Sequence, residues 1–395
     1  MSNDGELGDV QCTFECDASS ADWLVLSASV SEELNQPYEL SAALSTDDVD
    51  ADGTEMLGES CTLIFERDDL TNPYPAIIHR VEDTAAGDRL KEVRVWAAPA
   101  LWLLSQNRQT RIFQEMTVPD ILDKVLGDGL SAYERKHETD LSRTYPKCEY
   151  RLQYDESDWA FCERLMEEEG IIYWFNRDDS AEVLFLTDDP HASRDVESRD
   201  GGNDVAFSAH MGARECIDNF RRSSSMRPTK LSMRHFNWTL PSLFIEEEKE
   251  GQAGGDGADG SAIGPTRETY EHDLVPPTLH EYTDGDGYQK NDAKEQAEMR
   301  RELDARDKLV MQGSGAVVGF CAGGAFNLTT HDLEGEYVLT TVTHSFNSRS
   351  ATYSNGFSCI PAKTPYRPNR HTHKPRVLGL ETATVVGPSG QEIHT

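Results

Sequence analysis

Basic residues are scarce in this sequence of 395 residues. There are 37 lysines and arginines against 71 aspartates and glutamates, which gives a formal net charge of −34. Nucleic acids and anionic membranes carry charge of the same sign, so this balance argues against both as partners. Two explanations of the acidic surface stay open. It is either an adaptation for solubility, as in a salty cytoplasm, or an acidic lumen or docking face for basic cargo.

Long apolar segments are also missing. No apolar run approaches the length of a membrane span, and residues 1–10 are polar and acidic, unlike a secretory signal. We therefore expect a protein that assembles in the cytoplasm. If it leaves the cell, we expect a route other than general secretion.

The sequence contains none of the common catalytic motifs. The patterns G-x-S-x-G, H-E-x-x-H and G-x-x-x-x-G-K-[ST] are absent. Neighbouring carboxylates are inevitable among 71 acidic residues and carry no weight as acid–base pairs. His79 and His344 lie singly on expected strands. We therefore assign no catalytic, cofactor-binding or metal-binding residue, expect no cofactor, and predict that the protein is not an enzyme.

The cysteines do not form a metal-binding pattern. None of the eight belongs to a C-x-x-C pair, so a zinc framework is not expected. Several lie at expected core positions, which predicts reduced thiols that pack as small apolar side chains. The cysteines stand at positions 12, 16, 61, 148, 162, 216, 321 and 359.

One loop has the spacing of an EF-hand calcium loop. It begins at Asp48, ends at Glu59 and reads D-x-D-x-D-G-x5-E. Glu55 occupies a position that is normally aliphatic, and the preceding residues alternate as a strand where an EF-hand has a helix. We interpret the segment as a solvated strand-to-helix loop and keep calcium binding as an alternative. A second pattern, His371-x-His373, lacks a third ligand and is interpreted as polar surface.

The first part of the chain reads as a succession of short strands with turns between them. This pattern indicates an antiparallel barrel or sandwich. The expected strands lie at residues 10–16, 23–30, 38–44, 61–65, 76–81 and 93–97.

Residues 99–142 change to helical spacing. The expected main helix has Thr117 as N-cap, Pro119 just inside its start and Gly127 near its end. The polar residues 137–146 are expected to form a loop.

The most informative stretch is 152–175. Apolar residues at three- and four-residue spacing predict a helix over 155–170, with Asp155 at its start and Gly170 as a left-handed stop. The apolar run 171–175 and the segment 182–186 then predict a hairpin. We interpret this unit as a packing module without a catalytic group.

The remaining elements are less regular. A loop is expected at 188–203, and the glycine-rich segment 313–319 reads as a tight turn entering a strand, because its position and spacing do not fit a nucleotide-binding loop. The acidic, glycine-rich segment 246–264 is predicted to be disordered, and proline and basic residues from Pro361 onward predict an extended strap. Strands are expected near 205 and at 230–238, 326–328, 337–346 and 352–360, and a surface helix at 291–309.

Several short pieces resemble one protein family. They are R-I-F-Q at 111–114, T-V-P at 117–119, Q-Y at 153–154, E-S-D at 156–158, E-E-E-G-I at 167–171, G-E-Y-V-L-T at 335–340, C-I-P-A at 359–362, P-Y-R-P at 365–368 and residues 385–395. In this order they resemble the VgrG family, the trimeric spike at the tip of the type VI secretion system. The N-terminal part of that family is similar to the central hub of contractile phage tails.

The resemblance implies a mainly β fold with α+β insertions. Two antiparallel β-barrels, joined by the helix-and-hairpin module, would occur in each of three chains of a homotrimer, matching the sixfold symmetry of an inner tube. It also implies a structural hub that caps a hexameric tube protein, contacts baseplate proteins and carries the spike tip and effector cargo. Sheath contraction would translocate it out of the cell, with membranes met only by mechanical puncture.

Two alternatives remain open at this point. The first is the hub of a phage tail or of an extracellular contractile injection system. The second is an acidic calcium-binding or hydrolytic module, supported only by the EF-hand-like loop.

We divide the chain into four parts on these grounds. They are a first barrel domain at 1–105, a connecting α+β module at 106–200 with the helix 155–170, a second barrel domain at 201–365 with the insertion 246–264, and a Pro/basic strap at 366–395. In the family such a strap leads to a spike domain, which we do not find in these residues. We therefore expect a hub without its needle.

Overall fold

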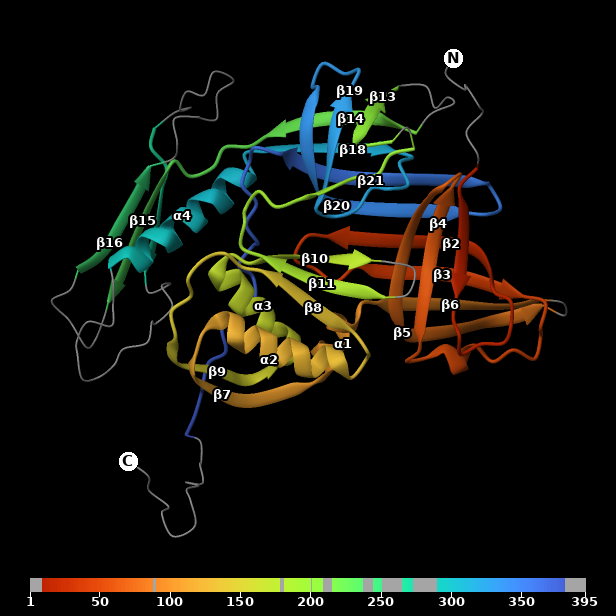
Figure 1. Cartoon of the computed structure of the whole chain (residues 1–395), viewed down its shortest axis with the longest axis horizontal. Coiled ribbons are helices and arrows are strands. Elements are labelled where there is room, and N and C mark those ends of the chain that lie inside the picture. The colour runs from red at the N-terminus through yellow and green to blue at the C-terminus, as the bar shows by residue number, and fades with distance from the viewer. Residues whose placement is uncertain are drawn as a thin grey trace, which may run out of the picture.

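The computed structural model describes residues 9–87, 90–177, 181–199, 201–208, 215–236, 244–250, 265–272 and 290–380. Strands dominate these residues, as expected for a mainly β fold (Figure 1). The second barrel, in green and blue, lies above the orange first barrel in Figure 1, and the helices α1–α3 lie below. No helix in the described ranges is long and apolar enough to cross a membrane.

The first barrel contains all six strands expected from alternation. Its strand order is β1-β4-β5-β6-β3-β2, with antiparallel neighbours throughout. Alternate side chains point inward, and Val30, Leu63 and Val95 are completely buried. The strands are β1 (Gln11–Glu15), β2 (Leu24–Glu33), β3 (Glu39–Thr46), β4 (Ser60–Arg67), β5 (Leu70–Gly87) and β6 (Leu90–Ala98).

The second barrel is a closed ring of six strands in the order β20-β21-β18-β14-β13-β19, with β19 pairing back to β20. The short strand β13 runs parallel to both of its neighbours, and the other pairs are antiparallel. The strands are β13 (Asp204–Phe207), β14 (Cys216–Ser224), β18 (Leu309–Gly315), β19 (Gly324–Thr329), β20 (Gly335–Asn347) and β21 (Thr352–Pro361), and β12 (Arg194–Asp195) adds to β19. The predicted mainly β, tail-hub-like fold is confirmed, but the prediction that this barrel is antiparallel is wrong at β13, which runs parallel to β14 and β19.

A single ladder joins the two barrels. Residues 27–33 of β2 pair with residues 341–347 of β20, so the sheet continues from one barrel into the other. Hydrogen bonding across this ladder fixes how the barrels lie relative to each other.

The connecting module packs beneath the first barrel. Thr117 caps α2 as predicted, accepting from Asp120 N (3.2 Å), and the Asp120 carboxylate accepts from Thr117 N (3.1 Å). Gly127, expected near the end of this helix, lies in its last part, and the helix continues to Ser131 and buries Leu130. The elements are α1 (Ala100–Leu103), the 3-10 turn η2 (Leu104–Gln106), β7 (Arg108–Met116), α2 (Val118–Ser131), β8 (Lys136–Asp140) and β9 (Cys148–Ser157).

The strand β8 corrects another expectation. Residues 137–146 were expected to form a loop, but residues 136–140 pair in parallel with β11 (Glu182–Thr187). The strand is polar because it forms the exposed edge of its three-stranded sheet, so it lacks the apolar alternation that marks buried strands.

The predicted central helix is α3 (Asp158–Glu169), and its end at Gly170 is confirmed by a left-handed φ of 65°. Its predicted start is wrong: Ser157 is the N-cap and accepts from Ala160 N (3.1 Å), whereas Asp155 lies in β9 and pairs with Arg108. The predicted hairpin is confirmed as β10 (Ile172–Arg177) and β11.

A separate three-stranded sheet lies beside the barrels, packed against α4 (Figure 1). Leu231, Met233, Ala297 and Met299 are buried in this unit. Its elements are β15 (Lys230–Phe236), β16 (Phe244–Glu250), β17 (Glu268–His272) and α4 (Lys290–Arg306).

The predicted start of the disordered insertion, at residue 246, is wrong. Residues 246–250 belong to β16, where Glu246 pairs with Arg234 (2.9 Å) and Glu248 with Lys230 (3.2 Å) across the ladder with β15. These ion pairs offset the acidic charge that suggested disorder. Residues 251–264 of the predicted insertion lie outside the described residues.

The turn expected at 313–319 is wrong for its first residues. Gly313 and Gly315 lie inside β18. A Cβ at Gly313 would collide with the ring of Phe357 on β21, so the glycine marks close packing instead of a turn.

The eight cysteines are free, as predicted. Six are buried, and only Cys12 and Cys16 are partly exposed.

Candidate functional site

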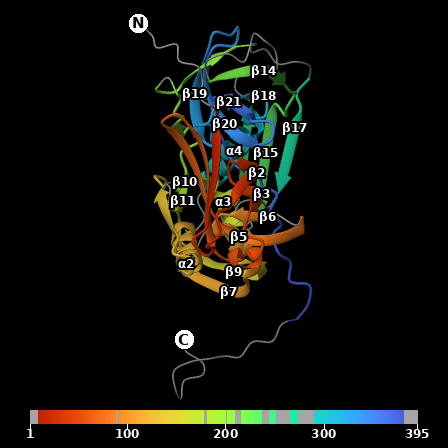
Figure 2. The ribbon, with the colours of Figure 1, turned by 90° about the vertical axis from the view of Figure 1, so that its right-hand side faces the viewer.

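Residues 362–380, here called the strap, leave β21 and pass α3 and α4 on the way to the lower edge of the molecule (Figures 1 and 2). Tyr366, Arg367 and Pro368 are buried although no strand or helix contains them. Buried irregular backbone needs polar partners. They come from a set that we call the strap seat: residues 167–170 at the end of α3, Asp188 after β11, and α4.

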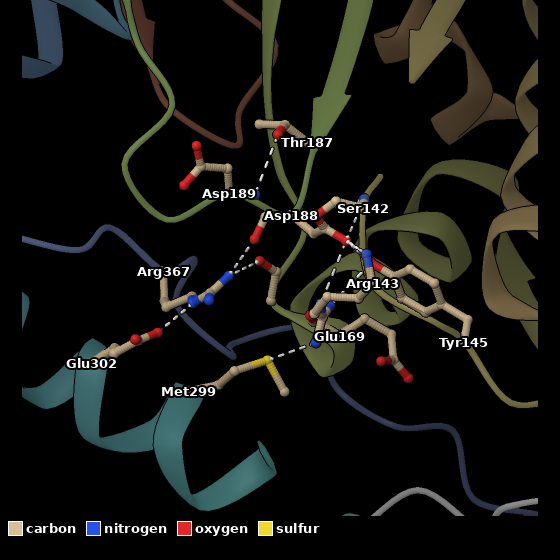
Figure 3. A network of polar contacts seen from close by, with 11 residues as sticks. Ser142, Arg143, Tyr145, Glu169, Thr187, Asp188, Asp189, Met299, Glu302 and Arg367 are labelled. Atoms are coloured by element: carbon tan, nitrogen blue, oxygen red, sulfur yellow. Dashed lines mark hydrogen bonds and ion pairs between the residues drawn. The ribbon is translucent and has the colours of Figure 1, made fainter. Parts of the chain in front are cut away.

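Arg367 is the central residue of this contact (Figure 3). Its Nη1 donates to the carbonyl oxygens of Gly170 (3.0 Å) and Asp188 (3.1 Å), and its Nε pairs with Glu302 on α4 (2.7 Å). One side chain therefore links the strap, the end of α3, the end of the hairpin and α4. The guanidinium is suited to this because its donors point in several fixed directions.

Gly170 makes this arrangement possible. It has a positive φ of 65°, and a Cβ there would lie 2.8 Å from the sulfur of Met299 and 3.3 Å from Cδ of Arg367. Glycine is therefore required both for the left-handed conformation and for the close approach of strap and α4.

Asp188 orders the loop beneath the strap (Figure 3). Its carboxylate accepts from the backbone N of Ser142 (3.1 Å) and Arg143 (2.9 Å) and from the hydroxyl of Tyr145 (3.0 Å). Burial disfavours the charge of Asp188, but these hydrogen bonds outweigh it and lower the pKa of the carboxyl below its usual value. Arg143 also donates to the carbonyl of Glu169.

Two further arginines hold the strap. Arg370 donates to the carbonyls of Glu167 (3.0 Å) and Glu168 (3.0 Å), where the α3 helix dipole is negative. Its burial, together with the nearby Arg300, lowers its pKa to about 10. Arg306 on α4 donates to the carbonyl of Arg367 (2.6 Å).

A buried carboxyl lies one helical turn before the strap seat. The Oε2 of Glu163 accepts from Trp159 Nε1 (3.0 Å) and from the hydroxyl of Tyr173 (3.0 Å). Burial raises the pKa of Glu163 to about 8, and the negative charge of Glu167 adds to the rise. Glu163 is therefore largely protonated at neutral pH.

Charged residues also fill the space between the barrels. Arg177 of β10 pairs with Glu32 of β2 (3.0 Å), with side-chain exposures of 4% and 6%. Its guanidinium lies 3.8 Å from the ring centre of Tyr74. Burial disfavours the charge of Glu32, but Arg177 and Arg194 outweigh it and lower its pKa.

The histidine at this interface is neutral. The ring of His344 is within hydrogen-bond distance of Phe320 O (3.0 Å) and Tyr353 Oη (2.6 Å), and it stacks on Phe65 of the first barrel. Burial lowers the pKa of His344 to about 4. His344, which the sequence showed only as a single histidine on an expected strand, therefore packs between the two barrels. His79, the other such histidine, stacks on Trp102.

These buried groups have structural partners within the fold. The carboxylates of Glu32 and Asp188 are held by arginines and backbone donors, and the thiol pKa values of buried Cys61 and Cys359 are raised by burial, which disfavours nucleophilic thiolates. The arrangement can fix segments relative to one another, which is a mechanical role.

Residues 31–350 match the phage tail baseplate hub (GPD) family. The chain belongs to this family. Among relatives of the hub chain are two spike proteins of the type VI secretion system from Pseudomonas aeruginosa. VgrG1b is 28% identical over 92% of this chain and 48% of its own length, and VgrG1a is 26% identical over 92% of this chain and 55% of its own length. The hub chain thus spans about half the length of these relatives, and the resemblance to VgrG proteins is confirmed.

Solved structures show the same hub fold. The E. coli c3393 protein, described as a component of the type VI secretion system, superposes with a TM-score of 0.65 at 18% identity, covering 91% of this chain and 80% of that chain. A tail protein from Neisseria meningitidis gives 0.62 at 10% identity, covering 89% and 96%. The Francisella PdpA–VgrG complex, half-lidded, gives 0.57 at 8% identity, covering 96% and 63%.

The sequence pieces that suggested the family meet in space within the hub. The E-E-E-G piece at 167–170 forms the strap seat that receives Arg367 of the P-Y-R-P piece. In the module, Arg111 donates to Gln153 (2.9 Å), which donates to Asp158 (2.9 Å). The sequence marks these residues as a family signature but does not predict their contacts. The signal in the sequence is the presence of polar and oppositely charged residues in these pieces, such as Arg111, Gln153 and Asp158.

The loop from Asp48 to Glu59 forms a strand-to-helix connection in this hub. Asp52 caps the 3-10 turn η1 (Gly53–Met56), accepting from Thr54 N (2.9 Å), and Asp48 accepts from Asp50 N (3.1 Å). Across the described ranges, no three His, Cys, Asp or Glu side chains gather as a metal site. His371 lies 3.6 Å from Glu167 in the strap seat. The absence of bound metal stays a prediction, which a calcium titration tests.

Proposed function

We propose that this chain is the structural hub of the spike complex of a type VI secretion system. In this role it caps the inner tube and carries the spike and its cargo when the sheath contracts. The proposal rests on membership of the hub family and on the named spike relatives. The observation that carries it is the pair of six-stranded barrels fixed to each other by the β2–β20 ladder.

The barrel pair suits a cap on a sixfold tube. Three chains with two similar barrels each present six similar units, so a homotrimer matches a hexameric tube protein. The ladder and the buried Glu32–Arg177 pair hold the two barrels as one piece. A cap that the contracting sheath drives forward must be rigid, and this role requires no reactive groups.

The strap suits the attachment of the parts that follow a hub. It leaves the barrel, is held by Arg367, Arg370 and Arg306, and runs to the lower edge of the molecule (Figure 2). Load applied to the distal end of the chain would reach the module through these side chains. Spike tip, effector cargo and baseplate proteins are the proposed partners, and the charge of −34 argues against nucleic acid as a partner.

We further propose that the chain has no enzymatic activity, assembles in the cytoplasm and leaves the cell with the apparatus. Activity assays of the purified protein against peptidoglycan and peptides test the first point. Hydrolysis that is lost on substitution of a specific residue would refute it.

Light scattering of the purified protein at low and high salt tests the assembly. We expect a mass of about three times 44.1 kDa that becomes more populated at high salt, because each chain contributes −34 of mutual repulsion. A monomer at every salt concentration would contradict a trimer formed by this chain alone. Co-sedimentation with the hexameric tube protein then tests capping, with bovine serum albumin, another acidic protein, as the charge control.

The hub of a phage tail is the second candidate, favoured by the tail-protein superposition. The two are separated by mixing the chain with tube proteins of each kind. Preferential capping of a phage tube would overturn the type VI assignment and leave the hub assignment standing.

A further inference from the structure

Cys16 directly follows the edge strand β1 of the first barrel, and Cys61 lies in β4, the strand that pairs with β1. Strands β1 and β4 pair with Phe14 opposite Leu63 and Glu15 opposite Thr62. Extending this register by one residue beyond the end of β1 places Cys16 opposite Cys61. Directly opposed residues of an antiparallel pair have Cα atoms about 4.5–5.5 Å apart, which is within the range of about 4.4–6.8 Å that a disulfide spans.

The two side chains also lie on the same face of the sheet. Phe14, Leu63 and Cys61 are buried and Cys16 is partly buried, whereas Glu15 and Ser60 are exposed, so the alternation directs both thiols inward. Burial is the main cause that raises the pKa of the Cys61 thiol. The negative charge of a Cys16 thiolate is the second cause of the rise. This coupling agrees with the proximity given by the register.

We propose that Cys16 and Cys61 form a dithiol site that closes to a disulfide when the folded protein meets a disulfide oxidant. The inference stands on the strand register and does not depend on the proposed function. The bond ties the edge strand β1 to β4.

Cys16 is the attacking residue because it is partly exposed while Cys61 is buried. Its thiolate attacks one sulfur of oxidised glutathione, forms a mixed disulfide and releases one glutathione thiolate. The Cys61 thiolate then attacks the Cys16 sulfur, forms the protein disulfide and releases the second glutathione. The two protein thiols lose two protons and two electrons, and the glutathione disulfide gains them as two thiols.

Burial raises the pKa of both thiols, so reaction is slow at neutral pH. Because the thiolate fraction grows about tenfold per pH unit below the pKa, the rate of closure should rise by about that factor per unit. The two thiols therefore form their disulfide slowly at neutral pH and do not respond quickly to an oxidant.

The test uses the reduced, full 395-residue chain. It is incubated folded at pH 8.5 with excess oxidised glutathione, alkylated, and digested for mass spectrometry. We expect a linked peptide pair containing Cys16 and Cys61 and the loss of two hydrogens from the intact mass. Cys16→Ser should abolish the link. Cys12→Ser should keep it, because Cys12 lies on the same strand and face but opposite Phe65.

Thermal unfolding provides a second readout. The disulfide closes a loop over residues 16–61 and restricts the unfolded chain, so oxidised wild type should melt several degrees above reduced wild type. Cys16→Ser should melt at the same temperature in both conditions, and its circular dichroism verifies that it folds.

Three results would overturn the proposal. They are a folded protein whose eight thiols all stay alkylatable at pH 8.5, a Cys16–glutathione adduct that never closes, and a link that forms only in denaturant.

Discussion

Replacing Arg177 by methionine should be among the most damaging single changes between the barrels. The guanidinium pairs with Glu32 (3.0 Å), belongs to a side chain that is only 4% exposed, and lies over the ring of Tyr74. Methionine keeps much of the apolar volume but leaves the Glu32 carboxylate buried. Removing one partner of a buried ion pair costs about 3–5 kcal/mol, so we expect a loss of about 4 kcal/mol at pH 7.5.

Urea unfolding followed by tryptophan fluorescence and circular dichroism measures this loss. Arg80→Met is the matched control, because Arg80 also pairs with a glutamate, Glu82, but its side chain is 58% exposed. An exposed pair contributes about 0–1 kcal/mol, so the control should change little. The double variant with Glu32→Gln should recover part of the loss, because no unpaired carboxylate remains.

The pH dependence makes the prediction sharper. In the wild type the pKa of Glu32 is lowered, so its contribution to stability is present above the ordinary glutamate pKa and is lost as the pH falls. Without Arg177 the pKa of Glu32 should rise, and acid should then neutralise the buried charge. The difference from wild type should therefore shrink as the pH is lowered. A loss no larger than that of Arg80→Met, or a difference that grows in acid, would refute the reasoning.

Three further changes test the strap seat. Glu163→Gln should remove a stability loss that wild type suffers as the pH rises from 4.5 through about 8, because the folded-state pKa of Glu163 is raised. The gain above pH 8 should be on the order of 5 kcal/mol in urea titrations, and equal pH profiles would contradict this. Gly170→Ala should cost more than Gly58→Ala, since both have positive φ but only Gly170 is crowded by Met299; an equal drop in melting temperature would argue against the crowding. Arg367→Ala should speed hydrogen exchange across 362–372, with exposed Lys363→Ala as control, and unchanged exchange would show that Arg367 does not hold the strap.

The sequence predicts the regular elements best where one face is buried. Alternation located the six strands of the first barrel and most of the second, because the inward residues of those strands are apolar. The strand β14 was not predicted: only its first residues face the core, a bulge shifts its register after Ile217, and its end is exposed. The strand β8 was not predicted for a related reason: it is an exposed edge strand, which needs no apolar residues.

The strap seat could be predicted only in part. The pieces E-E-E-G and P-Y-R-P were visible, but they are separated by almost 200 residues, and local patterns say nothing about which distant pieces meet. The start of α3 was misplaced by three residues because Asp155 and Ser157 are both good N-caps, and the pairing of β7 with β9 decided between them.

The ladder between β2 and β20 sets the order in which this protein can fold. Ser31 faces Thr343 across it, 312 residues further along the chain. During synthesis, the first barrel therefore emerges with the outer edge of β2 unpaired until β20 has been translated. Such delayed, distant pairing slows folding and exposes a strand edge to other nascent chains. A fragment that stops before Gly335, and so lacks β20, should consequently aggregate, even though it contains every strand of the first barrel.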